Sequence, residues 1–214
     1  MSSSKRQGRS RHGAWLTGTA VLAAMTMHGV AASALAQDTK PVVRVANSTR
    51  PAATALAAAA MRGDLTEVRA LLARQADVNA ATGDGMSALH WAAERGDAAM
   101  VQALLKAGAS TTGITKNGGY TPLHVAARAG HGAAVKALLA GGADAKALTT
   151  TGATALHLAA EAGDAVAVSA LAGAKADVNA LETAWGQTPL MFAAAANRPA
   201  AVTALLKAGA NPKV

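Results

Sequence analysis

The sequence predicts an all-α solenoid of five helix-turn-helix units with short β-hairpin or turn fingers. A seven-residue segment at 121–127, Thr-Pro-Leu-His-Val-Ala-Ala, recurs in varied form from residues 54, 87, 154 and 188. These starts are 33, 34, 33 and 34 residues apart, and a fixed period of this size is typical of stacked repeats. The chain is 51% hydrophobic yet only 2% aromatic. Such a core must come from small helices packed at short range, because it has few large side chains to bury.

The N-terminus is predicted to be a secretory signal peptide covering residues 1–36. Lys5, Arg6, Arg9 and Arg11 provide a positive start, an alanine-rich apolar segment follows, and Ala34-Leu35-Ala36 has the small-x-small form of a cleavage site. The alternative is a membrane anchor that stays attached, since the segment has about the length of a short spanning helix. The twin-arginine export route is disfavoured because no two arginines are adjacent. We expect cleavage after Ala36, a periplasmic or secreted location, and a linker over residues 37–50.

Charge and cysteine content restrict the possible functions. The formal charge is +8, but four of the 20 basic residues lie in the first eleven positions, which leaves 16 basic against 12 acidic residues, a net of +4. That mild excess predicts no nucleic-acid partner. The chain has no cysteine, which excludes disulfides and thiol catalysis.

The repeated segment is expected to open the first helix of each unit. In the third unit Thr121 is a predicted N-cap and Pro122 stands at the first helical position, where its missing N–H costs nothing. Paired alanines end the segment and would let neighbouring first helices approach closely. A glycine, or Asn197 in the fifth unit, then marks the helix end, where a left-handed conformation is needed. The glycines are Gly63, Gly96, Gly130 and Gly163.

The second helix of each unit has its own apolar columns. Valine recurs at 68, 101, 135, 168 and 202, and leucine recurs three residues later in every unit. This spacing predicts one buried stripe on the helix. Each unit then closes with a segment such as Lys-Ala-Asp-Val-Asn-Ala at 175–180.

Taken together, these motifs resemble the ankyrin-repeat family over residues 51–214. The resemblance implies five repeats, at about 51–83, 84–116, 117–150, 151–183 and 184–214, each with paired antiparallel helices and a protruding finger. It also implies that the repeated histidine bonds to the neighbouring turn. Two positions depart from the family: Gln75 and Lys175 replace glycine after the second helix. If φ is positive there, each costs about 1 kcal/mol relative to glycine. Met191 replaces the histidine in the fifth unit.

Three patterns suggest chemistry, and each has a structural explanation. His90 with Glu94, and His157 with Glu161, are spaced for a shared metal ion, but the histidine belongs to the repeat motif. Residues 83–88 fit a G-x-G-x-x-A dinucleotide pattern without the strand and βαβ frame that it requires. Ser87 and His90 are close in sequence, yet Ser87 is the N-cap equivalent of Thr121. We therefore predict no catalytic residues, no metal site and no cofactor.

Partner-binding residues are expected where the repeats differ, on the fingers and on exposed positions of the first helices. In the resembled family these positions form a concave binding face. Tyr120 and Trp185 stand out because aromatic and arginine side chains dominate interface energies. The alternative is that each ring folds back onto its own hairpin, while Trp91 and Phe192 are predicted packing residues. The predicted binding residues are Met86, Glu94, Arg95, Tyr120, Arg128, Glu161, Trp185 and Gln187.

The predicted function is a non-catalytic protein–protein interaction module in the bacterial periplasm, acting as a monomer on a partner protein. No nucleic-acid contact is expected, nor membrane contact after signal removal. The alternative is an immunity-type inhibitor of a secreted toxin or enzyme. A ligand carrier or an enzyme has the least support, because no constellation of reactive side chains stands out in the sequence.

Overall fold

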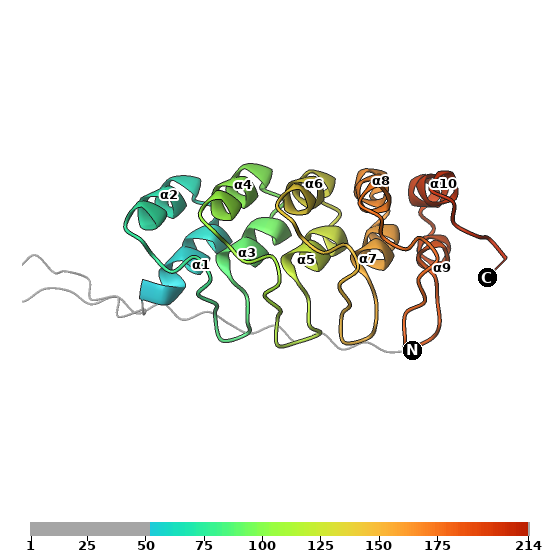
Figure 1. Cartoon of the computed structure of the whole chain (residues 1–214), viewed down its shortest axis with the longest axis horizontal. Helices are drawn as coiled ribbons and strands as arrows, with labels where there is room; N and C mark the ends of the chain where they lie inside the picture. The colour runs from blue at the N-terminus through green and yellow to red at the C-terminus, as the bar shows by residue number, and fades with distance from the viewer. Residues whose placement is uncertain (1–51, 214) are drawn as a thin grey trace, which may run out of the picture. The chain divides into compact units, whose positions relative to one another are not determined.

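The computed structural model describes residues 52–213, which fold into five helix pairs. The helices form two rows in Figure 1, and neighbours within each row are in contact. The predicted all-α repeat solenoid is therefore confirmed, whereas the predicted signal peptide and linker lie outside the described residues. The first helices are α1 (Ala52–Arg62), α3 (Ala88–Glu94), α5 (Pro122–Arg128), α7 (Ala155–Ala162) and α9 (Pro189–Ala195). The second helices are α2 (Leu65–Ala73), α4 (Ala98–Lys106), α6 (Gly132–Ala140), α8 (Ala165–Gly173) and α10 (Pro199–Lys207).

None of the helices between residues 52 and 213 combines the length and the apolar character that a membrane crossing requires.

The repeated segment closes the start of α3, α5 and α7 with its histidine. The Nδ1 atom of His90, His124 and His157 accepts from the backbone N–H of the N-cap residue three positions earlier, at 3.2, 3.2 and 3.1 Å. A backbone N–H can only donate, so Nδ1 must accept and the neutral ring carries its proton on Nε2. That Nε2–H donates to the carbonyl of Tyr120, Ala147 and Gln187 respectively, at 3.2, 3.0 and 3.1 Å. The predicted bond from the histidine to the neighbouring turn is thus confirmed.

These three histidine rings are completely buried. Burial lowers the pKa of each ring below its usual value, because the charged imidazolium would lose its hydration. The bonds to backbone carbonyls oppose this effect more weakly, as do the nearby carboxylates of Asp84, Asp144, Asp177 and Glu182. The rings are therefore neutral at pH 7 and serve as structural connections between units.

With one exception, the paired alanines of the first helices are buried, as expected of residues that let neighbouring helices approach closely. Both members of the pair are fully buried in units 1 to 4, and in unit 5 Ala193 is buried while Ala194 is exposed. The valine and leucine columns of the second helices follow the same rule. They are completely buried in the inner units, whereas Leu71 in unit 1 and Val202 in unit 5 are only partly buried.

The turn after each first helix needs a left-handed residue. The four predicted glycines have φ between 68° and 85°, and Asn197 has φ 54°, as expected for its position. Side chains from the following unit bond to carbonyls at the end of the preceding first helix. Arg95 donates to the Met61 carbonyl at 3.4 Å and Arg198 donates through Nε to the Glu161 carbonyl at 3.0 Å. These bonds satisfy carbonyl groups that a helix end leaves without intrahelical partners.

The fingers are short hairpins that open units 2 to 5, and we number them by unit. Finger 2 (82–86) and finger 4 (149–153) have five residues, while finger 3 (115–120) and finger 5 (182–187) have six. In each finger the first residue donates its N–H to the carbonyl of the last. Isolated antiparallel bridges flank fingers 2 and 4, at Ala81–Ser87 and Leu148–Thr154. The extra residue in fingers 3 and 5 explains why the repeat period alternates between 33 and 34 residues.

Backbone bonds also join successive fingers. The N–H of Lys116 donates to the carbonyl of Asp84 at 2.9 Å, Thr150 to Gly118 at 3.0 Å, and Thr183 to Thr151 at 3.0 Å. One backbone bond at each junction thus joins finger 3 to finger 2, finger 4 to finger 3, and finger 5 to finger 4, and the Thr183 hydroxyl adds a second bond to the Thr151 carbonyl. The side chains that the fingers carry are therefore fixed relative to one another along the array.

Candidate functional site

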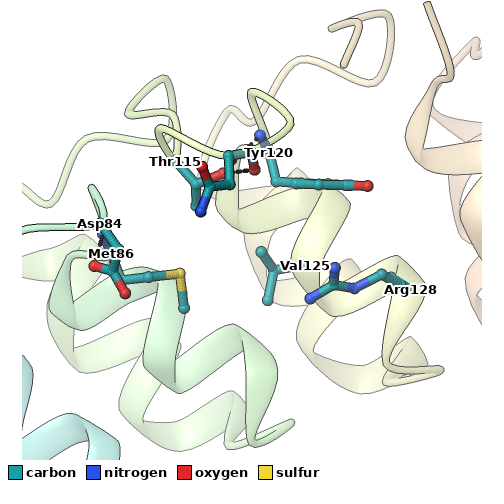
Figure 2. Close-up of a pocket in the computed structure, with 7 residues that line it drawn as sticks. Asp84, Met86, Thr115, Tyr120, Val125 and Arg128 are labelled. Carbon is teal, nitrogen blue, oxygen red and sulfur yellow. Dashed lines mark hydrogen bonds between the residues drawn. The ribbon is translucent and has the colours of Figure 1, made fainter. Parts of the chain in front are cut away.

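A row of cavities lies where the fingers meet the first helices. The first, which we call the Met86 cavity, is about 210 Å³ and lies between fingers 2 and 3 above α5. Figure 2 shows Met86 and Asp84 on one side of it and Tyr120 and Arg128 on the other. Its lining residues are Asp84, Met86, Thr115, Asn117, Tyr120, Val125 and Arg128.

Arg128 connects finger 3 to two first helices. Its guanidinium carbon is 4.9 Å from the centroid of the Tyr120 ring, a cation–π distance. One of its terminal nitrogens is 3.6 Å from Oε2 of Glu94 on α3. Both charged side chains remain about half exposed, so the ion pair orients Arg128 and contributes little stability. Figure 2 shows the guanidinium beneath the Tyr120 ring, at the edge of the cavity.

The second cavity, which we call the aromatic–acid cavity, is about 240 Å³ and lies over finger 4. Three aromatic residues, Tyr120, Trp185 and Phe192, and two acidic residues, Glu161 and Glu182, are among those that line it. Trp185 is 83% exposed, the highest value among the exposed large hydrophobic side chains of the described chain. Smaller residues complete the lining: Thr149, Thr151, Ala153, Leu158 and Ala184.

Glu182 organises finger 5 from within. Its carboxylate accepts from the backbone N–H of Ala184 at 2.6 Å, Trp185 at 2.7 Å and Gln187 at 3.2 Å. Desolvation raises the pKa of this carboxyl group, but the three N–H bonds together outweigh it and hold the pKa below its usual value. Glu182 is therefore ionised at pH 7 and places a fixed negative charge in the wall of the aromatic–acid cavity.

The third cavity, which we call the Gln187 cavity, continues the row over α9. It is about 280 Å³ and is lined by Glu161, Gln187, Phe192, Ala195 and Ala196. Tyr120 is shared by the first and second cavities, and Glu161 by the second and third. The three cavities thus lie in a row in which each shares a lining residue with the next, and we call this row the finger groove.

The structure brings most of the predicted binding residues into the finger groove. Met86, Tyr120, Arg128, Glu161, Trp185 and Gln187 line it, and Glu94 pairs with Arg128 at its edge. Arg95 does not line it, because its guanidinium reaches back to the Met61 carbonyl and lies over Gly63.

The two finger aromatics adopt different positions. Tyr120 packs over Gly118 of its own finger, with its ring 6.3 Å from the His124 ring at an edge-to-face angle. Trp185 extends into solvent instead of folding onto its hairpin. The alternative that each ring folds back onto its own hairpin therefore holds in part for Tyr120 and does not hold for Trp185.

Sequence reasoning missed one column of groove residues. Val125, Leu158 and Phe192 occupy the variable position after the histidine in the repeated segment, and each lines a cavity. Phe192 also packs edge-to-face on His157 at 5.2 Å, so its predicted packing role holds beside its place in the groove. The variation of this position between Ala58, Trp91, Val125, Leu158 and Phe192, inside an otherwise repeated motif, could have indicated it.

The alternative chemical patterns have structural roles at these positions. Both ring nitrogens of His90 and of His157 are engaged by backbone groups. Residues 83–88 form the turn of finger 2 and the start of α3, closed by a bond from the Thr82 N–H to the Met86 carbonyl. Across residues 52–213 no group of three or more His, Asp or Glu side chains could hold a metal ion.

A protein-family model described as ankyrin repeats, in three copies, matches residues 21–115, 56–147 and 123–214. No curated protein matches the chain.

Proposed function

We propose that this chain, which belongs to the ankyrin-repeat family, binds a partner protein through the finger groove. The repeats of this family are interaction modules, and its members generally act by binding and without catalysis. The observation that carries the proposal is the row of three cavities along fingers 2 to 5, in which Tyr120 lines the first two and Glu161 lines the last two. A large exposed ring such as Trp185 is typical of an interaction surface.

The chemistry of the groove favours a protein partner. Tyr120, Arg128 and Trp185 are of the residue types that contribute most to interface energies. Tyr120 packs over Gly118, and Arg128 lies over the Tyr120 ring and beside Glu94, so less side-chain freedom is lost when a partner binds. Bonds between the fingers fix their spacing in the same way.

A crosslinked capture from the periplasm, with identification by mass spectrometry, tests this proposal. Tyr120→Ala, Arg128→Ala and Trp185→Ala combined should lower capture of the identified partner at least about thirtyfold, since each is of a hot-spot type. A matched variant carries Arg69→Ala and Lys136→Ala, both exposed on second helices, and should capture the partner as the wild type does. Circular dichroism should show the same helix content in all three proteins.

Retained capture by the triple variant, with its helix content intact, would refute a role for the groove. The identity of the partner distinguishes an adaptor from an immunity-type inhibitor, the two functions that the sequence suggests. A non-toxic assembly component supports an adaptor, whereas one-to-one inhibition of a captured toxic enzyme supports an immunity-type inhibitor.

We further propose that the protein is exported to the periplasm or secreted as a monomer without its first 36 residues. The support is the positive start, apolar segment and Ala34-Leu35-Ala36 site of residues 1–36. Fractionation of cells should place the chain outside the cytoplasm, and sequencing of its N-terminus should begin at Gln37. A cytoplasmic chain that keeps residues 1–36 would contradict this location.

A further inference from the structure

The aromatic–acid cavity has a composition suited to a cation. It combines the rings of Tyr120, Trp185 and Phe192 with the carboxylates of Glu161 and Glu182, and no basic residue lines it. Ring faces attract cations through their quadrupole, and the attraction adds to that of a carboxylate nearby. The composition is opposite in sign to the chain after its first eleven residues, in which 16 basic and 12 acidic residues give a net charge of +4.

The carboxylate of Glu161 is available to a partner. Among the described residues it makes no ion pair within 4.0 Å, because the two ion pairs found are Arg62–Glu67 and Arg128–Glu94. Arg198 donates to the backbone carbonyl of Glu161, not to its carboxylate, and does not line the cavity. The side chain of Glu161 is therefore exposed and uncompensated at the cavity wall.

Finger 4 creates the open space. The last finger residue is Met86 in finger 2, Tyr120 in finger 3 and Gln187 in finger 5, but Ala153 in finger 4. With only a methyl group at this position, finger 4 leaves room between the rings of Tyr120 and Trp185 on the six-residue fingers at either side. The cavity is thus the consequence of a short finger with a small side chain between two longer fingers that carry aromatic rings.

The structure already contains an example of the recognition that this cavity offers. Arg128 lies over the Tyr120 ring at 4.9 Å and faces the carboxylate of Glu94. Tyr120 lines the Met86 cavity, where Arg128 lies, and it also lines the aromatic–acid cavity. A second guanidinium in the aromatic–acid cavity would meet Tyr120 together with Trp185 and the carboxylate of Glu161.

We propose that the aromatic–acid cavity binds the side chain of an arginine presented by the partner protein. Arginine fits better than lysine because its guanidinium is planar, stacks on aromatic faces and bonds to a carboxylate through two N–H groups. The inference rests on the proposed function, since the arginine belongs to the bound partner. It adds a requirement on that partner: an exposed arginine in a segment that can enter the finger groove.

The test uses the full protein labelled with nitrogen-15 and short glycine–serine peptides with one central residue. The indole N–H signal of Trp185, assigned with Trp185→Phe, reports binding. The arginine peptide should shift it saturably, with half-saturation at roughly millimolar concentration, as a single anchored side chain allows. The citrulline peptide, which has the same shape without the charge, should give no saturable shift at matched ionic strength.

Variants of the protein connect the shift to the cavity. Glu161→Gln should weaken arginine binding by about twofold to fivefold, the range of a solvent-exposed ion pair. Ala153→Met fills the cavity with the residue that finger 2 carries at the same position, and should abolish the shift. Glu67→Gln removes a carboxylate from α2 in unit 1 and should bind the arginine peptide as the wild type does.

Three results would overturn the assignment: no saturable shift with arginine, an equal shift with citrulline, or tighter binding of the matching lysine peptide. Failure of this inference is distinguishable from failure of the proposed function. If partner capture depends on Tyr120, Arg128 and Trp185 but the arginine peptide does not bind, the groove stands and the arginine subsite is wrong. If the arginine peptide binds but groove substitutions leave capture unchanged, the cavity recognises arginine and the proposed function is wrong.

Discussion

Besides Asn197, two residues of the array have a left-handed backbone without being glycine. Gln75 has φ 59° and Lys175 has φ 64°, at the turn after the second helix. Units 2, 3 and 5 use Gly108, Gly142 and Gly209 at this turn, with φ between 85° and 94°. The sequence predicts backbone strain at these two residues if their φ is positive, and the structure shows that it is positive. A side chain with a Cβ is disfavoured there because the Cβ approaches the following carbonyl oxygen.

Replacing Gln75 and Lys175 by glycine should therefore stabilise the protein, by about 1 kcal/mol for each change. The residues belong to units 1 and 4, so the two gains should add. Urea unfolding followed by circular dichroism measures the effect. Gly108→Ala is the reverse control and should cost about the same amount, since a Cβ at Gly108 meets no atom within 4 Å and only the backbone conformation is penalised. No gain from either glycine would show that the surrounding turn relaxes the strain.

The sequence predicts the helices of this structure but not the groove between its fingers. The helices and their caps follow from Thr121, Pro122 and the glycine columns, because these residue types act locally. The groove depends on contacts between fingers from different units, such as the bond from Lys116 to Asp84. Such contacts depend on finger length, and the sequence shows an alternating period without showing where the extra residue lies. That is why Tyr120 and Trp185 could be selected from sequence, whereas the cavity between them could not.

The buried carboxylate of Glu182 should control the stability of finger 5. Glu182→Ala leaves the N–H groups of Ala184, Trp185 and Gln187 without their acceptor, so the urea midpoint should fall at pH 7. Glu182→Thr should lose less stability than Glu182→Ala, because Thr115 holds the equally long finger 3 by accepting from the Tyr120 N–H at 3.1 Å.

The native pKa of Glu182 is lowered from 4.5, so the stabilisation by its carboxylate is present above that value and is lost as the pH falls through the native pKa. The difference in free energy of unfolding between Glu182→Gln and wild type should therefore narrow as the pH falls below 4.5. A difference that stays constant with pH would contradict the role of the charge.

At the scale of the whole array, each unit is stabilised by its neighbours, because no helix pair buries its apolar face alone. Three of the junctions are bridged by a buried histidine: His90 reaches finger 3, His124 reaches the loop before finger 4, and His157 reaches finger 5. Unit 1 has Ala57 at the histidine position, so finger 2 receives no such bond. Each junction from unit 2 to unit 5 therefore contains one buried histidine that must be neutral to make its two backbone bonds.

Acid should loosen these three junctions together. Burial lowers the native pKa of each histidine below 6.5, so the unfolded chain binds protons first as the pH falls. The stability from the three neutral rings is thus complete above pH 6.5 and is lost as the pH falls through the native pKa values, at up to about 4 kcal/mol per pH unit. Urea unfolding between pH 7.5 and 5.5 measures this slope of unfolding free energy against pH.

His157→Met introduces the residue that the fifth unit has at this position, Met191, and should reduce the slope by about a third. Val125→Ala removes buried apolar volume without a titrating group, so it should lower stability and leave the slope unchanged. An unchanged slope in His157→Met would mean that other groups cause the acid sensitivity.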